Sequence, residues 1–230
     1  RHEAWENVAR KLAHEIKNPL TPIQLTIDNL KSKYEKYVDL SEKDKYNKNL
    51  NTILSQIKQI ENLVNEFSDF ARMPKPVLKK INLSDLISRS LNLHKISEEK
   101  INFNFLKKNK TYYVNGDEEQ LNRVFINLIK NSIESIYEKK NKNFDLKRKI
   151  EVEIYGDNNY IYVTTKDNGI GFDRVDKNKM ITPYFTTKKK GTGLGLAVVT
   201  KVISDHKGTI LFNSIDDGAM VKITLPKYNV

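Results

Sequence analysis

Cysteine is absent from the 230 residues of this sequence. Its absence excludes disulfide bonds, thiolate metal sites and redox chemistry at a protein thiol. Long apolar runs are absent as well, since none approaches the roughly 18 residues that cross a bilayer. The first ten residues have neither a signal-peptide pattern nor an initiator methionine. We therefore expect the sequence to be a part of a longer protein.

Acidic residues are too few to balance the basic ones, and the net charge is +11. Residues 1–75 hold 13 Lys and Arg against 11 Asp and Glu, so most of the surplus lies further along the chain. Such a surplus is typical of a nucleic-acid surface or of a site for a polyanionic nucleotide. We interpret the Lys-rich run 139–149 mainly as a solvated loop. This interpretation is weaker for the run 188–190, because that run adjoins a glycine-rich loop. Aromatic residues are scarce in these runs, with Phe144 alone inside them, which argues against a nucleic-acid-binding module.

Two heptad patterns fill the N-terminal third of the chain. Apolar residues recur there at steps of three and four, which predicts two long helices with coiled-coil seams. The first seam is Leu12, Ile16, Leu20, Ile23, Ile27, Leu30, Tyr34 and Tyr37, and the second is Tyr46, Leu50, Ile53, Ile57, Ile60, Val64 and Phe67. A short polar break at 39–44 joins the helices, so they lie antiparallel. A single hairpin cannot bury both seams well, and we expect a second copy to complete a four-helix bundle.

The segment Met73-Pro74-Lys75-Pro76 ends the second helix, because proline lacks the amide donor and restricts the residue before it. We place the domain boundary there, with a dimerisation domain over 1–75 and a second domain over 76–230. The pattern of the second domain predicts helices at 83–96, 118–137 and 194–206, and strands at 101–106, 112–114, 150–155, 160–165, 209–214 and 220–225. These elements predict an α/β sandwich with helices on one side of a mixed sheet.

The first candidate for chemistry is His14, in the segment His14-Glu15-Ile16-Lys17-Asn18-Pro19-Leu20-Thr21-Pro22. His14 is two positions from both Leu12 and Ile16, so on a helix it points away from the seam. A lone histidine is more often an ordinary surface residue than a catalytic one. Each proline inside a helix costs about 3 kcal/mol. Two of them beside an exposed imidazole indicate that the imidazole is positioned for a purpose.

The second group of candidates lies between Asn127 and Gly195. Asn127 and Asn131 are four residues apart on a helix and share a face, where amide oxygens suit a hydrated cation. The segment Asp167-Asn168-Gly169-Ile170-Gly171 follows a strand, and its carboxylate suits the adenine amino group, although a plain turn is an equally good interpretation of this segment alone. Gly191-Thr192-Gly193-Leu194-Gly195 leads into a helix, whose free amides suit phosphates. Glycine spacing alone is a weak signal.

The segment from His14 to Pro22 closely resembles the phosphoacceptor motif of sensor histidine kinases, and residues 4–25 look most like the NtrY type of nitrogen-regulation sensor. The later motifs, in this order, resemble the N, G1, F and G2 boxes of the GHKL (Bergerat) ATP-binding fold, with Pro183-Tyr184-Phe185-Thr186-Thr187-Lys188 as the F box. The resemblance implies a helical hairpin that dimerises into a four-helix bundle, followed by a GHKL α/β sandwich.

The resemblance also implies roles for individual residues. His14 is the nucleophile, Glu15 orients or deprotonates its imidazole, and Asn18 positions water for dephosphorylation. Asn131 binds Mg²⁺ directly, Asn127 supports the ion or its water, and Asp167 recognises adenine. The other residues assigned to ATP are Lys130, Gly169, Gly171, Phe185, Thr187, Lys188, Gly191, Thr192, Gly193, Leu194 and Gly195, and residues 172–190 form a lid over the nucleotide.

The implied activity is Mg·ATP-dependent autophosphorylation of His14, phosphotransfer to an aspartate of an NtrX-like response regulator, and phosphatase activity on that regulator. The implied setting is a homodimer in the cytoplasmic portion of a membrane-anchored bacterial sensor, without nucleic acid as a partner. The alternative is a GHKL ATPase that acts as a conformational clamp. Related clamp ATPases carry a water-activating glutamate where this sequence has Asn127, and an amide is not a general base. The stimulus, the choice between transfer within and between subunits, and the role of 139–149 stay open.

Overall fold

The computed structural model describes residues 2–108, 110–139, 148–172 and 193–228. The backbone divides into two compact units, a hairpin unit that ends at Pro74 and an α/β unit that begins at Lys75. No helix in the described ranges is long and apolar enough to cross a membrane.

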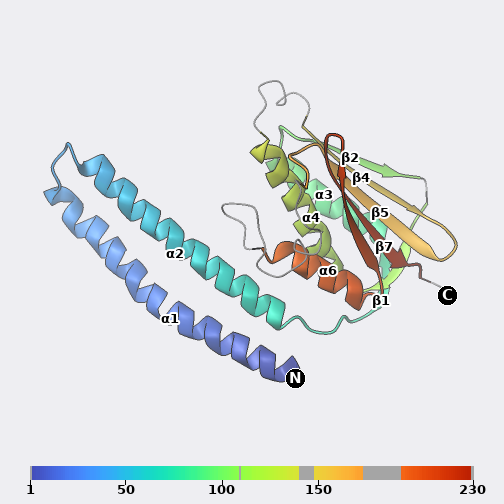
Figure 1. The fold of residues 1–230 in the computed structure, drawn as a ribbon, viewed down its shortest axis with the longest axis horizontal. Helices are drawn as coiled ribbons and strands as arrows, with labels where there is room; N and C mark the ends of the chain where they lie inside the picture. The colour runs from blue at the N-terminus through green and yellow to red at the C-terminus, as the bar shows by residue number, and fades with distance from the viewer. Residues whose placement is uncertain (1, 109, 140–147, 173–192, 229–230) are drawn as a thin grey trace. The chain divides into compact units, whose positions relative to one another are not determined.

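The hairpin unit consists of α1 (His2–Tyr34), the short 3-10 helix η1 (Glu35–Tyr37) and α2 (Lys43–Ala71). Helices α1 and α2 run side by side along their length (Figure 1). Leu20 and Ile27 of α1 and Leu50 and Ile57 of α2 form a buried core, against which Tyr46 and Leu54 pack. The Tyr46 hydroxyl donates to the carbonyl of Leu30 at 2.8 Å and ties the loop end of the hairpin together. The predicted antiparallel hairpin is confirmed, although its first helix ends at Tyr34 rather than continuing to Tyr37.

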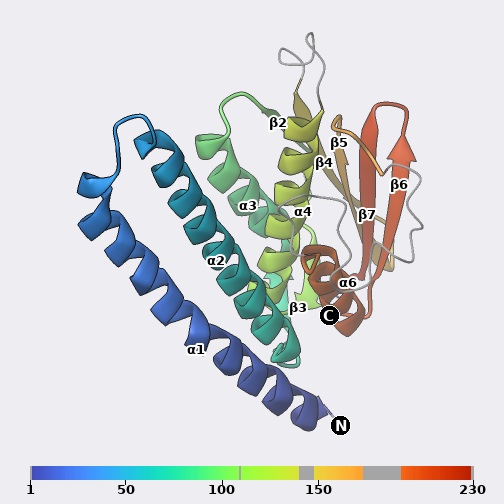
Figure 2. The same ribbon diagram turned by 60° about the vertical axis from the view of Figure 1, so that its left-hand side comes forward.

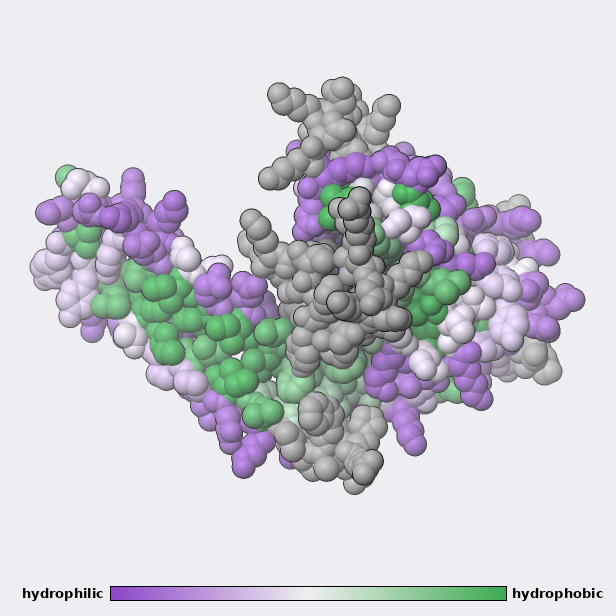
Figure 3. Space-filling model, in the orientation of Figure 1, coloured by the Kyte–Doolittle hydropathy of each residue, from purple (hydrophilic) through white to green (hydrophobic). Residues whose placement is uncertain are grey.

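The two predicted seams each divide into a buried row and an exposed row. Seven-residue steps separate Leu20 from Ile27 and Leu50 from Ile57, and these four side chains face the partner helix of the same hairpin. Five further seam positions form a row that stays 38% to 45% exposed: Ile16, Ile23 and Leu30 on α1, and Ile53 and Ile60 on α2. Figure 3 shows a hydrophobic band along the hairpin. The hairpin by itself therefore leaves part of its apolar pattern exposed.

The α/β unit contains a mixed five-stranded sheet in the order β2-β4-β5-β7-β6, with β2 parallel to β4 and all other pairs antiparallel. The strands of this sheet are β2 (Asn102–Lys107), β4 (Lys149–Gly156), β5 (Tyr160–Asp167), β6 (Thr209–Ile215) and β7 (Gly218–Pro226). A separate two-stranded sheet pairs β1 (Lys79–Asn82) with β3 (Tyr113–Gly116). The segment of β1 was missed from the sequence, because four residues with one buried position show no clear period.

Three helices, α3 (Leu83–Ser97), α4 (Glu118–Glu138) and α6 (Gly195–Asp205), cover one face of the large sheet (Figure 2). Alternate residues of the central strands, such as Ile150, Val152 and Ile154 of β4, are buried toward these helices. The period-2 pattern thus places one sheet face in the core. The predicted sandwich with helices on one side of a mixed sheet is confirmed.

Asp117 fixes the start of α4. Its carboxylate accepts hydrogen bonds from the amides of Gln120 in the first helical turn (3.1 Å) and Val77 in the segment after the boundary prolines (2.9 Å). Its own amide donates to Nε2 of the buried His206, just past α6 (2.9 Å). Burial raises the pKa of Asp117, but the amides of Val77 and Gln120 outweigh it, and the pKa lies below its usual range. Through its carboxylate and its backbone amide, Asp117 therefore connects the start of α4 to the residue that follows α6.

Candidate active site

The hairpin unit presents His14 on the exposed surface of α1. Glu15 is also exposed and lies 3.9 Å from the Lys11 ammonium, one turn earlier. Asn18 is exposed one turn after His14 and shares its face. Pro19 and Pro22 lie inside the helix. The catalytic roles of His14, Glu15 and Asn18 stay predictions, and the geometry leaves all three accessible to a reactant.

In the α/β unit, α4 and the start of α6 bring together residues that are more than sixty positions apart in sequence. A Cβ built on Gly195 would lie 3.6 Å from Oδ1 of Asn127 and 4.0 Å from Nδ2 of Asn131. The backbone at the N-terminus of α6 therefore adjoins the paired asparagines. Free helix N-terminal amides next to amide oxygens suit a phosphate chain with its counter-ion. Lys130 is exposed on α4, and Gly193 precedes α6 with a φ of +71°.

Asp167 ends β5 and is buried, with 7% of its surface exposed. Its Oδ1 accepts a hydrogen bond from the Gly169 amide at 3.0 Å and lies 3.5 Å from the Ser135 hydroxyl. Burial raises the pKa of Asp167, while the amides of Gly169 and Ala219 and the hydroxyls of Ser132 and Ser135 oppose that rise. A buried carboxylate with directed donors around it is suited to select one hydrogen-bond donor group from a ligand.

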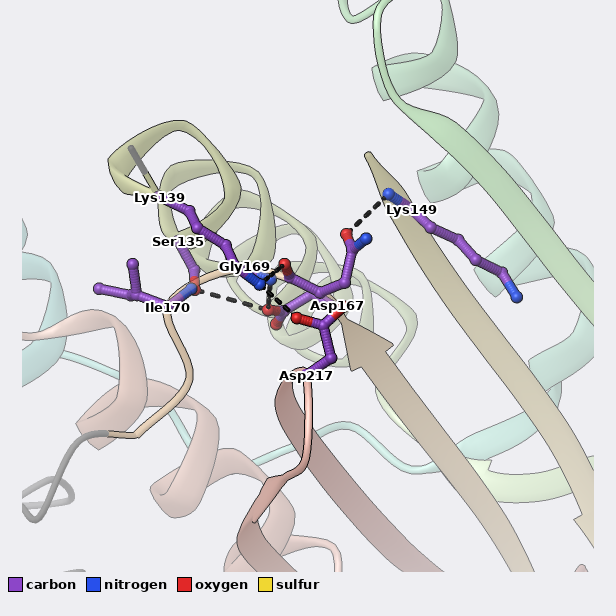
Figure 4. A network of polar contacts seen from close by, with 8 residues as sticks. Ser135, Lys139, Lys149, Asp167, Gly169, Ile170 and Asp217 are labelled. Carbon is purple, nitrogen blue, oxygen red and sulfur yellow. Dashed lines mark hydrogen bonds and ion pairs between the residues drawn. The ribbon is translucent and has the colours of Figure 1, made fainter. Parts of the chain in front are cut away.

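The turn after Asp167 packs directly on α4 (Figure 4). A Cβ at Gly169 would lie 2.3 Å from the Ser135 hydroxyl and 2.5 Å from the Ser135 carbonyl carbon, so only glycine fits. The Ile170 amide bonds to both oxygens of Ser135, at 3.1 Å to Oγ and 3.2 Å to the carbonyl. Gly171 has a φ of +76°, which favours glycine.

Sequence reasoning missed Ser132 and Ser135, which hold Asp167 and its turn. The available signal was spacing, because Asn127, Asn131 and Ser135 follow one another at four-residue steps on α4. The predicted lid 172–190 lies outside the described residues except for Phe172, and so do Phe185, Thr187, Lys188, Gly191 and Thr192. Phe172 packs edge-on against Phe212, with ring centroids 5.9 Å apart.

The described residues fit a nucleotide with a divalent cation. They contain no cluster of three His, Asp or Glu side chains that would hold a metal ion alone. A cation there would depend on the amide oxygens of Asn127 and Asn131 together with ligand phosphates, which is a ligand set that Mg²⁺ accepts.

Comparison with known proteins agrees with this geometry. Residues 4–76 match the family model of the His Kinase A (phospho-acceptor) domain, and residues 116–229 match that of the histidine kinase-, DNA gyrase B-, and HSP90-like ATPases. The catalytic domain of the histidine kinase ThkA is 31% identical, with a TM-score of 0.56 over 65% of this chain and 97% of that one. The chain belongs to the sensor histidine kinase family.

Longer relatives of this sensor histidine kinase chain match both of its units. Nitrogen regulation protein NtrY of Azorhizobium caulinodans is 35% identical over 227 residues, which are 98% of this chain and 29% of the relative. A putative NtrY-like sensor histidine kinase of Rickettsia felis is 36% identical over 96% of this chain and 36% of its own length. ThkA in complex with the response regulator TrrA is 26% identical, with a TM-score of 0.68 over 96% of this chain and 61% of that one. The chain spans about a third of the length of the NtrY-type relatives.

Proposed function

We propose that the chain is the catalytic core of a sensor histidine kinase that transfers the γ-phosphoryl group of ATP to His14 and then to an aspartate of a response regulator. The observation that carries this proposal is that one unit has an exposed His14 and the other brings together groups that suit a nucleotide. The proposal includes removal of the phosphoryl group from the regulator.

The α/β unit binds the two ends of ATP with different elements. Asp167 accepts the adenine amino group, and the α6 amides near Gly193 and Gly195 hold the phosphates. Asn131 ligates Mg²⁺ directly and Asn127 supports the ion or its water. When bound, Mg²⁺ neutralises charge that develops on the phosphates. Lys130 and the residues of 185–192 named above complete the contacts to ATP.

In the proposed reaction, a ring nitrogen of His14 bonds to the γ-phosphorus as the bond to the β,γ-bridging oxygen breaks, and ADP leaves with that electron pair. Glu15 accepts a hydrogen bond from the other ring nitrogen, which makes the attacking nitrogen more basic. A neutral imidazole is a good nucleophile near neutral pH.

Asn127 favours the kinase over the clamp ATPase. Its amide stands beside the phosphate site, 3.6 Å from where a Gly195 Cβ would lie. An amide does not take a proton from water at neutral pH. The site therefore holds ATP for an external nucleophile.

The proposal is tested by incubating the chain with labelled Mg·ATP and mapping the modified residue. Phosphohistidine is stable in alkali and labile in acid, so we expect alkali-stable label on His14. ATP hydrolysis without any label on the chain would favour the clamp ATPase.

We further propose that the exposed rows of the hairpin unit pair two copies into a four-helix bundle. Replacing both Ile53 and Ile60 by aspartate is expected to give a folded monomer, because these side chains are exposed in the single hairpin and a buried charge at a dimer contact is severely penalised. Light scattering at micromolar concentration measures the change.

Ile57 provides the contrasting variant, because it is 5% exposed and belongs to the core of the single hairpin. Ile57→Asp is expected to lower the helix content of the hairpin itself, which circular dichroism detects. A wild-type chain that is monomeric at these concentrations would contradict the proposed dimer.

The proposed partner is the receiver domain of an NtrX-like response regulator, and the proposed setting is the cytoplasmic portion of a membrane-anchored sensor. The similarity to NtrY supports both, and the complex of ThkA with TrrA supports a regulator as partner. Comparing phosphotransfer rates to several purified receiver domains tests the choice of regulator.

A further inference from the structure

Four polar residues at four-residue steps form a stripe along α4 and its C-cap: Asn127, Asn131, Ser135 and Lys139. Residues at this spacing lie along one face of a helix. The first two adjoin the α6 N-terminus, and Ser135 holds the turn after Asp167. Lys139 caps the helix at the end of this stripe and has no assigned role. At about 1.5 Å per residue, the stripe extends over about 18 Å.

The Lys139 ammonium reaches the residue next to Asp167. It donates to the carbonyl oxygen of Asn168 at 2.8 Å. The side chain of Asn168 accepts a hydrogen bond from the Lys149 amide at 2.9 Å, and the Asn168 amide donates back to the Lys149 carbonyl at 3.3 Å. Both ends of the Lys-rich run 139–149 therefore contact Asn168, and Lys149 begins β4 rather than lying in a loop.

Lys139 also forms an ion pair with Asp217, in the turn between β6 and β7 (Figure 4). The next residue, Gly218, touches the Asp167 strand so closely that a Cβ on it would lie 1.9 Å from the Asp167 carbonyl oxygen. The Lys139 side chain is 22% exposed and that of Asp217 is 69% exposed. An exposed ion pair contributes little by itself. Its geometric effect is to hold the ammonium against the Asn168 carbonyl.

We propose that Lys139 is a positioning residue for adenine recognition, which acts through Asn168 to hold the Asp167 carboxylate in place. Ser135 and Lys139 both contact the turn that follows Asp167. Ser135 packs on Gly169 and accepts a hydrogen bond from the Ile170 amide. Lys139 donates to the Asn168 carbonyl. Because Ser135 lies in α4 and Lys139 is the C-cap of that helix, they fix the adenine end of the site to the helix that carries Asn127 and Asn131. This inference rests on the proposed binding of adenine by Asp167.

The test measures dissociation constants for ATP and GTP with purified chains carrying Lys139→Met, which keeps the aliphatic stem and removes the ammonium. A charged hydrogen bond is lost, and the ATP dissociation constant is expected to rise about tenfold while that of GTP stays within about twofold. The preference for ATP over GTP therefore falls. Lys139→Arg retains a cationic donor and is expected to restore most of the preference.

The matched control is Lys201→Met. Lys201 is 28% exposed and pairs with Asp205 within α6 at 2.8 Å, so its loss removes a similar ion pair without touching Asn168. We expect this variant to keep the wild-type preference for ATP. Equal weakening of ATP and GTP binding by Lys139→Met would indicate a general structural role and overturn the inference, as would unchanged binding of ATP.

Nucleotide binding separates this inference from the proposed kinase activity. A wild-type chain that prefers ATP but never labels His14 would overturn the kinase and, with a lowered preference in Lys139→Met, support the positioning role. A wild-type chain without any preference for ATP over GTP would overturn the positioning role even if His14 were labelled.

Discussion

Replacing Glu15 by glutamine is expected to slow autophosphorylation by about 10²- to 10⁴-fold, which is the usual contribution of a general base. Glu15 is exposed next to His14, and its nearest ionic neighbour is Lys11 at 3.9 Å. An exposed pair at this distance contributes little to stability. We therefore expect the variant to keep its fold, while the imidazole loses the carboxylate that is proposed to make it more basic. The initial rate of alkali-stable labelling at saturating ATP measures the effect.

Glu42→Gln is the matched control for this variant. The Glu42 side chain is 61% exposed, close to the 59% of Glu15, and it pairs with Lys45 at 3.6 Å. Removing its charge is expected to leave the labelling rate unchanged. A Glu15→Gln chain that labels as fast as wild type would exclude Glu15 from the phosphoryl transfer step.

The Asn18→Ala variant is expected to separate autophosphorylation of His14 from hydrolysis of the regulator's phosphoryl group. It shares a face with His14 one turn along α1 and is exposed, so its amide is placed to hold a water molecule near a docked phosphoryl group. Asn18→Ala is expected to retain autophosphorylation and lose most of the phosphatase activity on the regulator. If Asn18 instead shaped the helix before Pro19, both activities would fall together.

The second large effect is expected at Asp167, where asparagine should weaken ATP binding by about 10- to 100-fold. The carboxylate is buried at the end of β5. Its loss removes the proposed charged acceptor for the adenine amino group. Discrimination between ATP and GTP should collapse with it, because selection by a buried polar group depends on that group. Calorimetric titration with each nucleotide measures both changes.

The same substitution has an effect on stability that depends on pH. Burial raises the pKa of Asp167, so the folded chain binds this proton more tightly than the unfolded chain. The contribution of Asp167 to the free energy of unfolding is therefore greatest below the ordinary Asp pKa and decreases as the pH rises through the raised value. The free energy of unfolding of Asp167→Asn should therefore increase relative to that of wild type as the pH rises from the ordinary Asp pKa through the raised pKa. At higher pH the difference between the two chains should stay constant.

Asp205→Asn serves as the control for both measurements, since Asp205 is partly exposed on α6 and pairs with Lys201. It is expected to keep ATP affinity. Unchanged ATP affinity in Asp167→Asn would remove Asp167 from the adenine site.

The sequence predicted the elements that have a strong period and the residues that have a distinctive chemistry. The heptads gave both long helices, and alternation gave the hairpin of β4 and β5 close to its observed bounds. The parallel pairing of β2 with β4 was not predicted, because it depends on contacts between segments that are distant in the chain. A heptad pattern alone does not predict which apolar residues pack within one hairpin and which stay exposed.

Around the site, the sequence indicated the groups that are proposed to contact a ligand, but not the residues that hold those groups in place. Asp167 and the paired asparagines have side chains whose chemistry suggests a nucleotide. Ser135 and Lys139 are common residue types, and their role is visible only when the turn after β5 is seen against the end of α4. Lys139 was grouped with its basic neighbours in sequence, whereas its partners are Asn168 and Asp217.

If the exposed row of Ile16, Ile23, Leu30, Ile53 and Ile60 is a dimer contact, the stability of the hairpin unit depends on the protein concentration. If a second copy covers this row, diluting the protein removes the cover, and the midpoint of hairpin unfolding falls with concentration. The α/β unit has its own buried core around Phe125, Ile150 and Ile161, so its unfolding midpoint is independent of dilution. Thermal scans across a hundredfold range of concentration would then show one transition that moves and one that stays.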